Sequence, residues 1–110
     1  MYKRQGHNAP INTIFTARVN TQKKAKIQKD PDNTDDDFVT SRILWLDGLE
    51  EGINRGPGVD SYNRYIYIHG THEEGLIGQK ASHGCIRMFN NDVIELFEIV
   101  KEGTKVYIRA

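Results

Sequence analysis

The sequence contains a single cysteine, Cys85, among its 110 residues. An internal disulfide is therefore excluded, and the cysteine count neither supports nor excludes an extracytoplasmic location. No apolar run approaches the length of a membrane-spanning helix, and no apolar signal-peptide core follows the basic start. Internal repeats are also missing. We therefore expect one domain over residues 1–110, with a size that allows a core without disulfide or metal support.

The chain also has no net charge, because its 15 Lys and Arg residues balance its 15 Asp and Glu residues. The charges are nevertheless unevenly placed: residues 1–29 hold seven Lys and Arg and no acid, whereas residues 30–37 hold five Asp and no base. The acidic run cancels the basic field within about two Debye lengths, and the basic run has no interleaved aromatics to stack on bases. We therefore expect no nucleic-acid partner, and we expect residues 1–10 and 21–37 to be mobile.

Alternating apolar and polar residues predict a mainly β protein. Strands are expected at residues 11–19, 38–46, 64–68 and 104–109. Trp45, the only tryptophan, is expected in the core because indole is usually buried. Residues 47–60, rich in Gly, Asn and Glu, are typical of a connection.

One helix is expected near the C-terminus. Val93, Leu96, Phe97 and Val100 recur at helical spacing, and the polar run Asn90-Asn91-Asp92 offers N-caps. The pattern predicts a helix over about residues 91–102 that buries this stripe against the sheet. The predicted fold class is therefore mainly β, with about five strands in a mixed β-sandwich or partly open barrel and one α-helix packed on it.

Residues suited to covalent chemistry concentrate in residues 65–89, which hold the only cysteine, three of the four histidines and four of the ten glycines. Within this stretch the run Ser82-His83-Gly84 directly precedes Cys85. A glycine beside a nucleophile permits a sharp turn and lets a substrate carbonyl approach main-chain N–H groups. We therefore expect the thiol at an exposed turn, although a lone cysteine is commonly a small buried hydrophobe.

A cysteine nucleophile needs an imidazole or a positive field nearby, since the thiolate is the attacking species. His69 ends a predicted strand and could reach across a folded loop to Cys85. His83 and Arg87 flank the thiol and add positive potential. His72 is expected to be a solvent-facing loop residue, because histidine is usually at least partly exposed.

Two other interpretations of the stretch remain open. The first is a zinc site, for which the possible ligands are His69, His72, His83 and Cys85. The glycines and Arg87 beside the cysteine suit turn chemistry better than a closed metal cage. The second is a redox-sensing cysteine, although the chain offers it no resolving thiol.

The runs Ile68-His69-Gly70-Thr71 and Ser82-His83-Gly84-Cys85-Ile86-Arg87-Met88 resemble the signature of the L,D-transpeptidase catalytic domain, of the YkuD type. Residues 42–46, 52–54 and the predicted helix are also similar to segments of that family, so the resemblance covers about residues 8–109. It implies a bacterial cysteine enzyme of the periplasm or cell envelope that acts on peptidoglycan stem peptides. It also implies a mainly-β sandwich, no metal or organic cofactor, and acylation by carbapenems.

The resemblance assigns roles to the residues that carry chemistry. Cys85 matches the nucleophile, and His69 matches the histidine that takes its proton, with the carbonyl of Gly70 a candidate for orienting the imidazole. The resemblance then implies a tetrahedral intermediate. The main-chain N–H groups of Gly84 and Cys85 are candidates for binding its oxyanion.

Three further positions belong to the same motif. His83, together with Gly84, matches the loop that shapes the site, and Ser82 is a further positioning candidate in the same run. Arg87 matches an arginine found in one branch of the family, and its charge could hold a substrate carboxylate.

The N-terminal part departs from the family pattern. The usual Thr-Pro-x-Gly element is Ala9-Pro10-Ile11-Asn12 here, so Asn12 replaces a glycine, and asparagine tolerates a positive φ. The family normally has several strands before this element, and a sheet without them exposes an unpaired edge. We therefore expect a partner or a dimer to cover that edge. A catalytically inactive peptidoglycan-binding domain is the alternative function.

Overall fold

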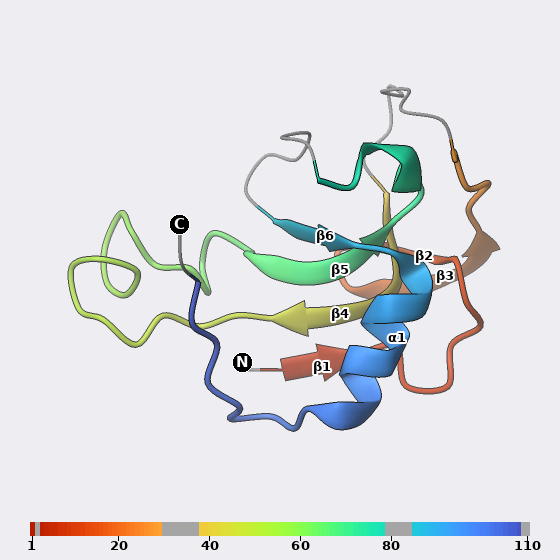
Figure 1. Ribbon diagram of the computed structural model, residues 1–110. Coiled ribbons are helices and arrows are strands. Elements are labelled where there is room, and N and C mark those ends of the chain that lie inside the picture. Colours follow the sequence, from red (N-terminus) through yellow and green to blue (C-terminus); the bar gives the residue numbers. More distant parts are fainter. Residues whose placement is uncertain (2, 30–37, 79–84, 109–110) are drawn as a thin grey trace.

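The computed structural model describes residues 1, 3–29, 38–78 and 85–108 (Figure 1). The described part contains six strands, one 3-10 helix and one α-helix: β1 (Lys3–Gln5), β2 (Thr13–Thr16), β3 (Val19–Lys24), β4 (Val39–Trp45), β5 (Tyr67–Thr71), η1 (Glu74–Leu76), β6 (Ile86–Met88) and α1 (Asn90–Ile99). All six strands belong to one sheet, and α1 packs across it (Figure 1). The predicted mainly-β class with one packed helix is confirmed.

The sheet has the strand order β3-β2-β4-β5-β6, and β1 pairs with β4 beside β2. All pairs are antiparallel except β5 with β6, which is parallel. Because β5 runs along one edge of β4, the strands β1 and β2 share the other edge, with β1 opposite residues 43–45. The chain's own residues 3–5 therefore cover part of the edge that the sequence predicted to be open.

The predicted strand over residues 11–19 is a hairpin in the structure. Ala17 and Arg18 both have positive φ, 48° and 69°, as a two-residue turn between antiparallel strands requires. The chain returns as β3, so residues 21–24, which the sequence predicted to belong to a mobile segment, form part of a strand. The alternation did not indicate β3 because nearly all of its residues are exposed. Asn12 has φ of 69°, as expected for the residue that replaces the family glycine.

The two central strands carry the candidate site. The strand predicted over residues 38–46 is confirmed as β4, whereas the strand predicted over residues 64–68 begins three residues later, at Tyr67. The delay follows from Tyr65, whose φ of 54° places it in a turn. His69 consequently lies in the middle of β5 and not at its end.

The helix α1 ends at Ile99, three residues before the predicted end. Its N-cap is Phe89, without a side-chain cap, so the expected capping by the polar run is wrong. The predicted apolar stripe is confirmed: Val93 and Phe97 are 0% and 3% exposed, and the rest of the stripe packs partly buried beside them.

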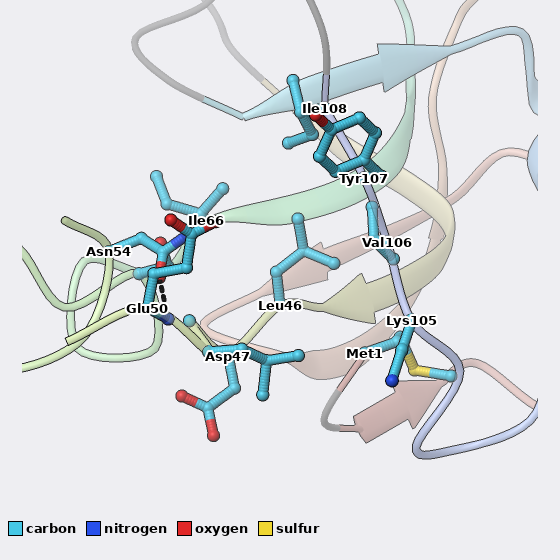
Figure 2. A pocket seen from close by; sticks show the side chains of 13 residues that line it. Met1, Leu46, Asp47, Glu50, Asn54, Ile66, Lys105, Val106, Tyr107 and Ile108 are labelled. Carbon is cyan, nitrogen blue, oxygen red and sulfur yellow. Dashed lines mark hydrogen bonds between the residues drawn. The ribbon is translucent and has the colours of Figure 1, made fainter.

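The predicted C-terminal strand is wrong, because residues 104–108 form no strand in the structure. This segment passes over Leu46 and Ile66 and leaves a hollow of about 280 Å³ beneath it (Figure 2). The lining residues do not include the predicted catalytic cysteine or histidine. In the described part of the chain, no helix is long and apolar enough to cross a membrane.

The sheet separates two clusters of buried side chains. One cluster, the helix face, consists of Leu44, Leu46 and Ile68 of the sheet with Val93 and Phe97 of α1. The other cluster, the cysteine face, consists of Ala9, Phe15, Ile43, Trp45 and Tyr67, with Cys85 packed partly buried against it. Alternation along β4 and β5 sends neighbouring residues to opposite faces, so the chemistry-bearing cysteine lies on the side away from α1.

Candidate active site

Cys85 lies immediately before β6 and is half-buried. Its sulfur accepts a hydrogen bond from the main-chain N–H of Tyr67 at 3.5 Å, and the thiol lies 3.3 Å from the carbonyl oxygen of Tyr65, to which it donates. The first contact stabilises the thiolate and the second stabilises the neutral thiol. The position is therefore neither a deep aliphatic site nor a fully exposed loop.

His69 is almost completely buried, with 2% exposure. Its Nδ1 lies 2.5 Å from the carbonyl oxygen of Gly70, the contact expected from the sequence. If Nδ1 carries the hydrogen and donates it to that carbonyl, Nε2 is the nitrogen with a lone pair that can take a proton. The carbonyl of Gly70 thus selects the tautomer that a general base needs.

The parallel pairing of β5 with β6 brings the histidine and the cysteine to one face. His69 lies opposite Arg87, and Ile68 lies opposite Ile86, so Cys85 is a diagonal neighbour of His69. Strand spacing and rise put their Cα atoms about 8 Å apart. Residues two apart on a strand point to the same face, so both side chains project from the cysteine face.

Gly70 lies directly over a buried asparagine. A Cβ atom at Gly70 would come within 2.5 Å of Asn90 Oδ1 and 2.6 Å of the Thr40 carbonyl oxygen. Asn90 Oδ1 accepts hydrogen bonds from the hydroxyls of Thr40 and Ser41 at 2.6 Å each, and its Nδ2 donates to the Thr71 carbonyl at 2.9 Å. This network joins β4, β5 and α1 directly behind His69, and only glycine fits there.

Glu74 of η1 accepts hydrogen bonds from the start of α1. Its Oε2 accepts from the main-chain N–H of Asn90 at 2.9 Å and from Nδ2 of the same residue at 2.8 Å, while Lys29 donates to Oε1 at 2.8 Å. Burial raises the pKa of Glu74, but the hydrogen bonds from Lys29 and Asn90 outweigh it, so the pKa lies below its usual value. A carboxylate from a distant segment thus replaces the expected side-chain cap of α1.

Arg87 lies on β6 with its side chain 8% exposed. It donates to the carboxylate of Glu73, which is 2% exposed, and to Thr71 Oγ1 at 2.7 Å. The guanidinium charge is therefore balanced inside the protein. Its predicted contact with a substrate carboxylate stays a prediction.

His72 is buried, with 4% exposure, so the prediction of a solvent-facing residue is wrong. Its ring contacts Phe38 with centroids 4.7 Å apart, and its carbonyl oxygen accepts from the Gln28 N–H at 2.7 Å. The segment after β5 folds inward against residues 28 and 38 and is not an open loop. No local pattern indicated this packing, because the partners of His72 lie about 40 residues away along the chain.

Three predicted site residues, Ser82, His83 and Gly84, lie outside the described residues. The predicted oxyanion-binding role of the Gly84 N–H and the positioning roles of the other two stay predictions. Among the described residues no group of three or more His, Cys, Asp and Glu side chains is arranged to hold a metal ion.

Sequence reasoning missed an aromatic wall beside the cysteine. Trp45 stacks on Tyr62, with ring centroids 4.3 Å apart and planes 5° apart, and meets Tyr67 edge to face at 5.7 Å. Arg18, from the β2–β3 turn, lies over the Trp45 and Tyr65 rings at 4.7 and 5.0 Å. The tyrosines at residues 62, 65 and 67 were the available signal, since their spacing concentrates aromatic rings just before the predicted histidine.

Comparison of the sequence with known proteins identifies the family of this chain. Residues 1–108 match the family model described as the L,D-transpeptidase catalytic domain, YkuD. The chain belongs to this family. The resemblance inferred from the two motifs is therefore confirmed over nearly the whole chain.

Individual relatives of the L,D-transpeptidase family match over shorter segments. The chain is 58% identical over 41 residues to YkuD of Bacillus subtilis, 49% over 43 residues to "Probable L,D-transpeptidase YbiS" of Escherichia coli, and 47% over 45 residues to "Probable L,D-transpeptidase ErfK/SrfK" of Salmonella typhimurium. The matches cover 37%, 39% and 41% of this chain, but only 25%, 14% and 15% of those relatives. No solved structure matches the chain.

Proposed function

We propose that this domain catalyses cysteine-dependent acyl transfer on peptidoglycan stem peptides in the bacterial cell envelope, as an L,D-transpeptidase. One observation carries the proposal: Cys85 and His69 project from the same sheet face, and the Gly70 carbonyl faces the Nδ1 of that histidine. Membership of the L,D-transpeptidase family supports the same reaction. The proposed reaction needs no metal or organic cofactor.

In the first half-reaction the thiol proton moves to Nε2 of His69, and the Cys85 thiolate attacks the carbonyl carbon that precedes the terminal D-alanine. A C–S bond forms, and the carbonyl oxygen becomes an oxyanion that main-chain N–H groups stabilise. The C–N bond then breaks. The imidazolium of His69 returns its proton to the departing amine, leaving a thioester on the cysteine.

In the second half-reaction an amine or a water molecule attacks the thioester. The attacking group gives its proton to His69, the C–S bond breaks, and the cysteine is regenerated as a thiol. An amine acceptor yields a cross-link or an attached protein, and water yields an L,D-carboxypeptidase reaction. The β-lactam ring of a carbapenem offers the same kind of carbonyl to the thiolate, so acylation by this class is expected.

Intact-mass spectrometry tests the proposal directly. The wild-type protein is incubated with a tetrapeptide donor or a carbapenem, and the mass of the expected acyl group should appear on the protein. Cys85→Ala should abolish the adduct and all product while the free energy of unfolding stays nearly unchanged, since the sulfur is only half-buried. His69→Ala should slow adduct formation by about 100-fold or more, because general-base catalysis contributes that much.

Each variant has an outcome that would contradict its assignment. An equal adduct on Cys85→Ala would remove the sulfur from the nucleophile role, and unchanged kinetics in His69→Ala would remove the imidazole from the base role. Wild-type protein that binds muropeptides but never forms an adduct would favour the inactive peptidoglycan-binding alternative. His7→Ala is the matched control, because His7 is exposed and lies in another segment.

A further inference from the structure

We propose that Arg18 holds the terminal carboxylate of the donor stem peptide beside the cysteine sulfur. This inference rests on the proposed acyl transfer, because it assigns one group of that donor to one residue of the site. It gives the β2–β3 turn a role in choosing substrates, although that turn lies far from the motif in sequence.

The surroundings of Arg18 orient its guanidinium. Its Nη1 donates to the Tyr67 hydroxyl at 2.8 Å, and its carbon Cζ lies over the rings of Trp45 and Tyr65 at 4.7 and 5.0 Å. Cation–ring contacts and a neutral hydrogen-bond acceptor hold the group in place without consuming its charge. Since a guanidinium carries five N–H donors, most of them remain for a ligand.

The two arginines of the cysteine face differ in available charge. Arg87 is paired with the buried carboxylate of Glu73. Within the described residues no carboxylate pairs with Arg18, which is half-buried. A substrate carboxylate bound at this face could therefore form charge-assisted, bidentate hydrogen bonds with the Arg18 guanidinium.

The distances suit a terminal carboxylate. In a stem peptide the terminal carboxyl carbon lies about 4 Å from the carbonyl carbon under attack, and that carbon must approach the sulfur to about 3.5 Å. The carboxylate therefore falls within about 7.5 Å of Cys85 Sγ. Tyr65 links the sulfur to Arg18, because its carbonyl oxygen lies 3.3 Å from the sulfur and its ring lies 5.0 Å from Arg18 Cζ.

The backbone around this span adopts conformations that non-glycine residues rarely take. Tyr65 has φ of 54° and Arg18 has φ of 69°. Both residues lie in turns, which bring the two segments together on this face. Tyr65 is 52% exposed, so this residue presents an accessible aromatic surface that contacts both the Arg18 guanidinium and the sulfur.

The first experiment compares a tetrapeptide donor that ends in D-alanine with the same peptide ending in D-alaninamide. For the wild-type protein we expect a higher kcat/KM with the free acid. Arg18→Gln should lower kcat/KM for the free acid by about tenfold or more, mainly through KM, and should leave the amide unchanged. Lys23→Gln, which removes an exposed charge from the same hairpin, should change neither donor.

The second experiment needs no enzymatic turnover. Iodoacetate carries a carboxylate and iodoacetamide does not, and the Cys85 thiolate displaces iodide from both. Arg18→Gln should lower the ratio of the two alkylation rates, iodoacetate over iodoacetamide, by about threefold, which is the effect in water of one unit charge placed about 7 Å from the iodoacetate carboxylate. Arg18→Lys should restore much of this ratio but less of the preference for the acid donor, because it keeps the charge without the planar fork.

The outcomes separate the two proposals. If no donor acylates the wild-type protein, the proposed function fails, and the alkylation ratio still decides whether Arg18 attracts a carboxylate. The carboxylate assignment is overturned if the wild-type protein turns over but Arg18→Gln lowers kcat/KM equally for the acid and amide donors. It is also overturned if Arg18→Gln lowers kcat/KM for neither donor. Thermal unfolding of each variant identifies any loss that comes from misfolding.

Discussion

The helix face and the cysteine face are built from different chemistry on the same strands. The helix face is aliphatic around Phe97 and closed by α1, with Leu44 and Val93 at 1% and 0% exposure. The cysteine face is aromatic and cationic, and it stays partly open at Cys85 and at Tyr65, which is 52% exposed.

This difference separates stability from reactivity within one thin sheet. Apolar burial beneath α1 supplies the hydrophobic free energy that holds β4 and β5 together. The opposite face can then present a thiol, an imidazole and an arginine around a smaller aromatic cluster of its own. Asn90 is the exception, because it lies on the helix face yet contacts the backbone directly behind His69.

The strongest test of the separation removes the largest side chain of the helix face. Phe97→Ala should lower the free energy of unfolding by about 3–5 kcal/mol, because the ring is 3% exposed and also lies 4.7 Å from the Arg4 guanidinium. The acylation rate per folded molecule should not change. Urea unfolding and intact-mass kinetics measure the two quantities, and Ile99→Ala, at an exposed position of the same helix, is the control.

If Phe97→Ala abolished acylation in protein that is demonstrably folded, the two faces would be coupled and the separation would be wrong. The complementary result is expected for Cys85→Ala, which should lose all acylation and little stability.

A second test uses the residue that reaches both faces. Asn90→Ala should lower the free energy of unfolding by about 2–3 kcal/mol, because it leaves buried hydroxyl and carbonyl groups without partners. It should also slow acylation of the folded protein, since the backbone that holds His69 loses its support. Asn91→Ala is the matched control at an exposed neighbouring position, and it should leave both quantities within about 0.5 kcal/mol of wild type. Normal acylation kinetics in folded Asn90→Ala would show that the network serves only stability.

The smallest expected effect is the pH dependence contributed by Glu74. Its pKa is lower in the folded protein than in the unfolded chain, so the unfolded state binds the proton more readily. The stabilisation is therefore fully present above the ordinary glutamate pKa, about 4.3, and is lost as the pH falls through the lower folded value. Unfolding measured from pH 7 to pH 3 should show a smaller decrease for Glu74→Gln than for wild type. An identical decrease in both proteins would contradict the proposed carboxylate contact with the start of α1.

The sequence predicted the elements whose signals are local. The branched residues of β4 and the helical spacing of Val93 and Phe97 placed both central elements, because these patterns depend only on neighbours in the chain. The prediction failed at β3, whose residues are too exposed to show an alternation of apolar and polar side chains. It also failed at residues 104–108, where the side chains do alternate but the described structure provides no strand partner. In both segments the pairing partner, and not the local pattern, decided the outcome.

The same distinction applies to the candidate site. The sequence by itself determined the nucleophile and base candidates, Cys85 and His69, and the family to which they belong, because the motif fixes those residue types at close spacing. Only the tertiary structure decided that His72 is buried, that Arg87 is paired with Glu73 and that Arg18 lies against the aromatic rings of Trp45 and Tyr65. These facts depend on contacts between segments tens of residues apart, and such contacts are set by strand pairing and burial, which no local pattern specifies.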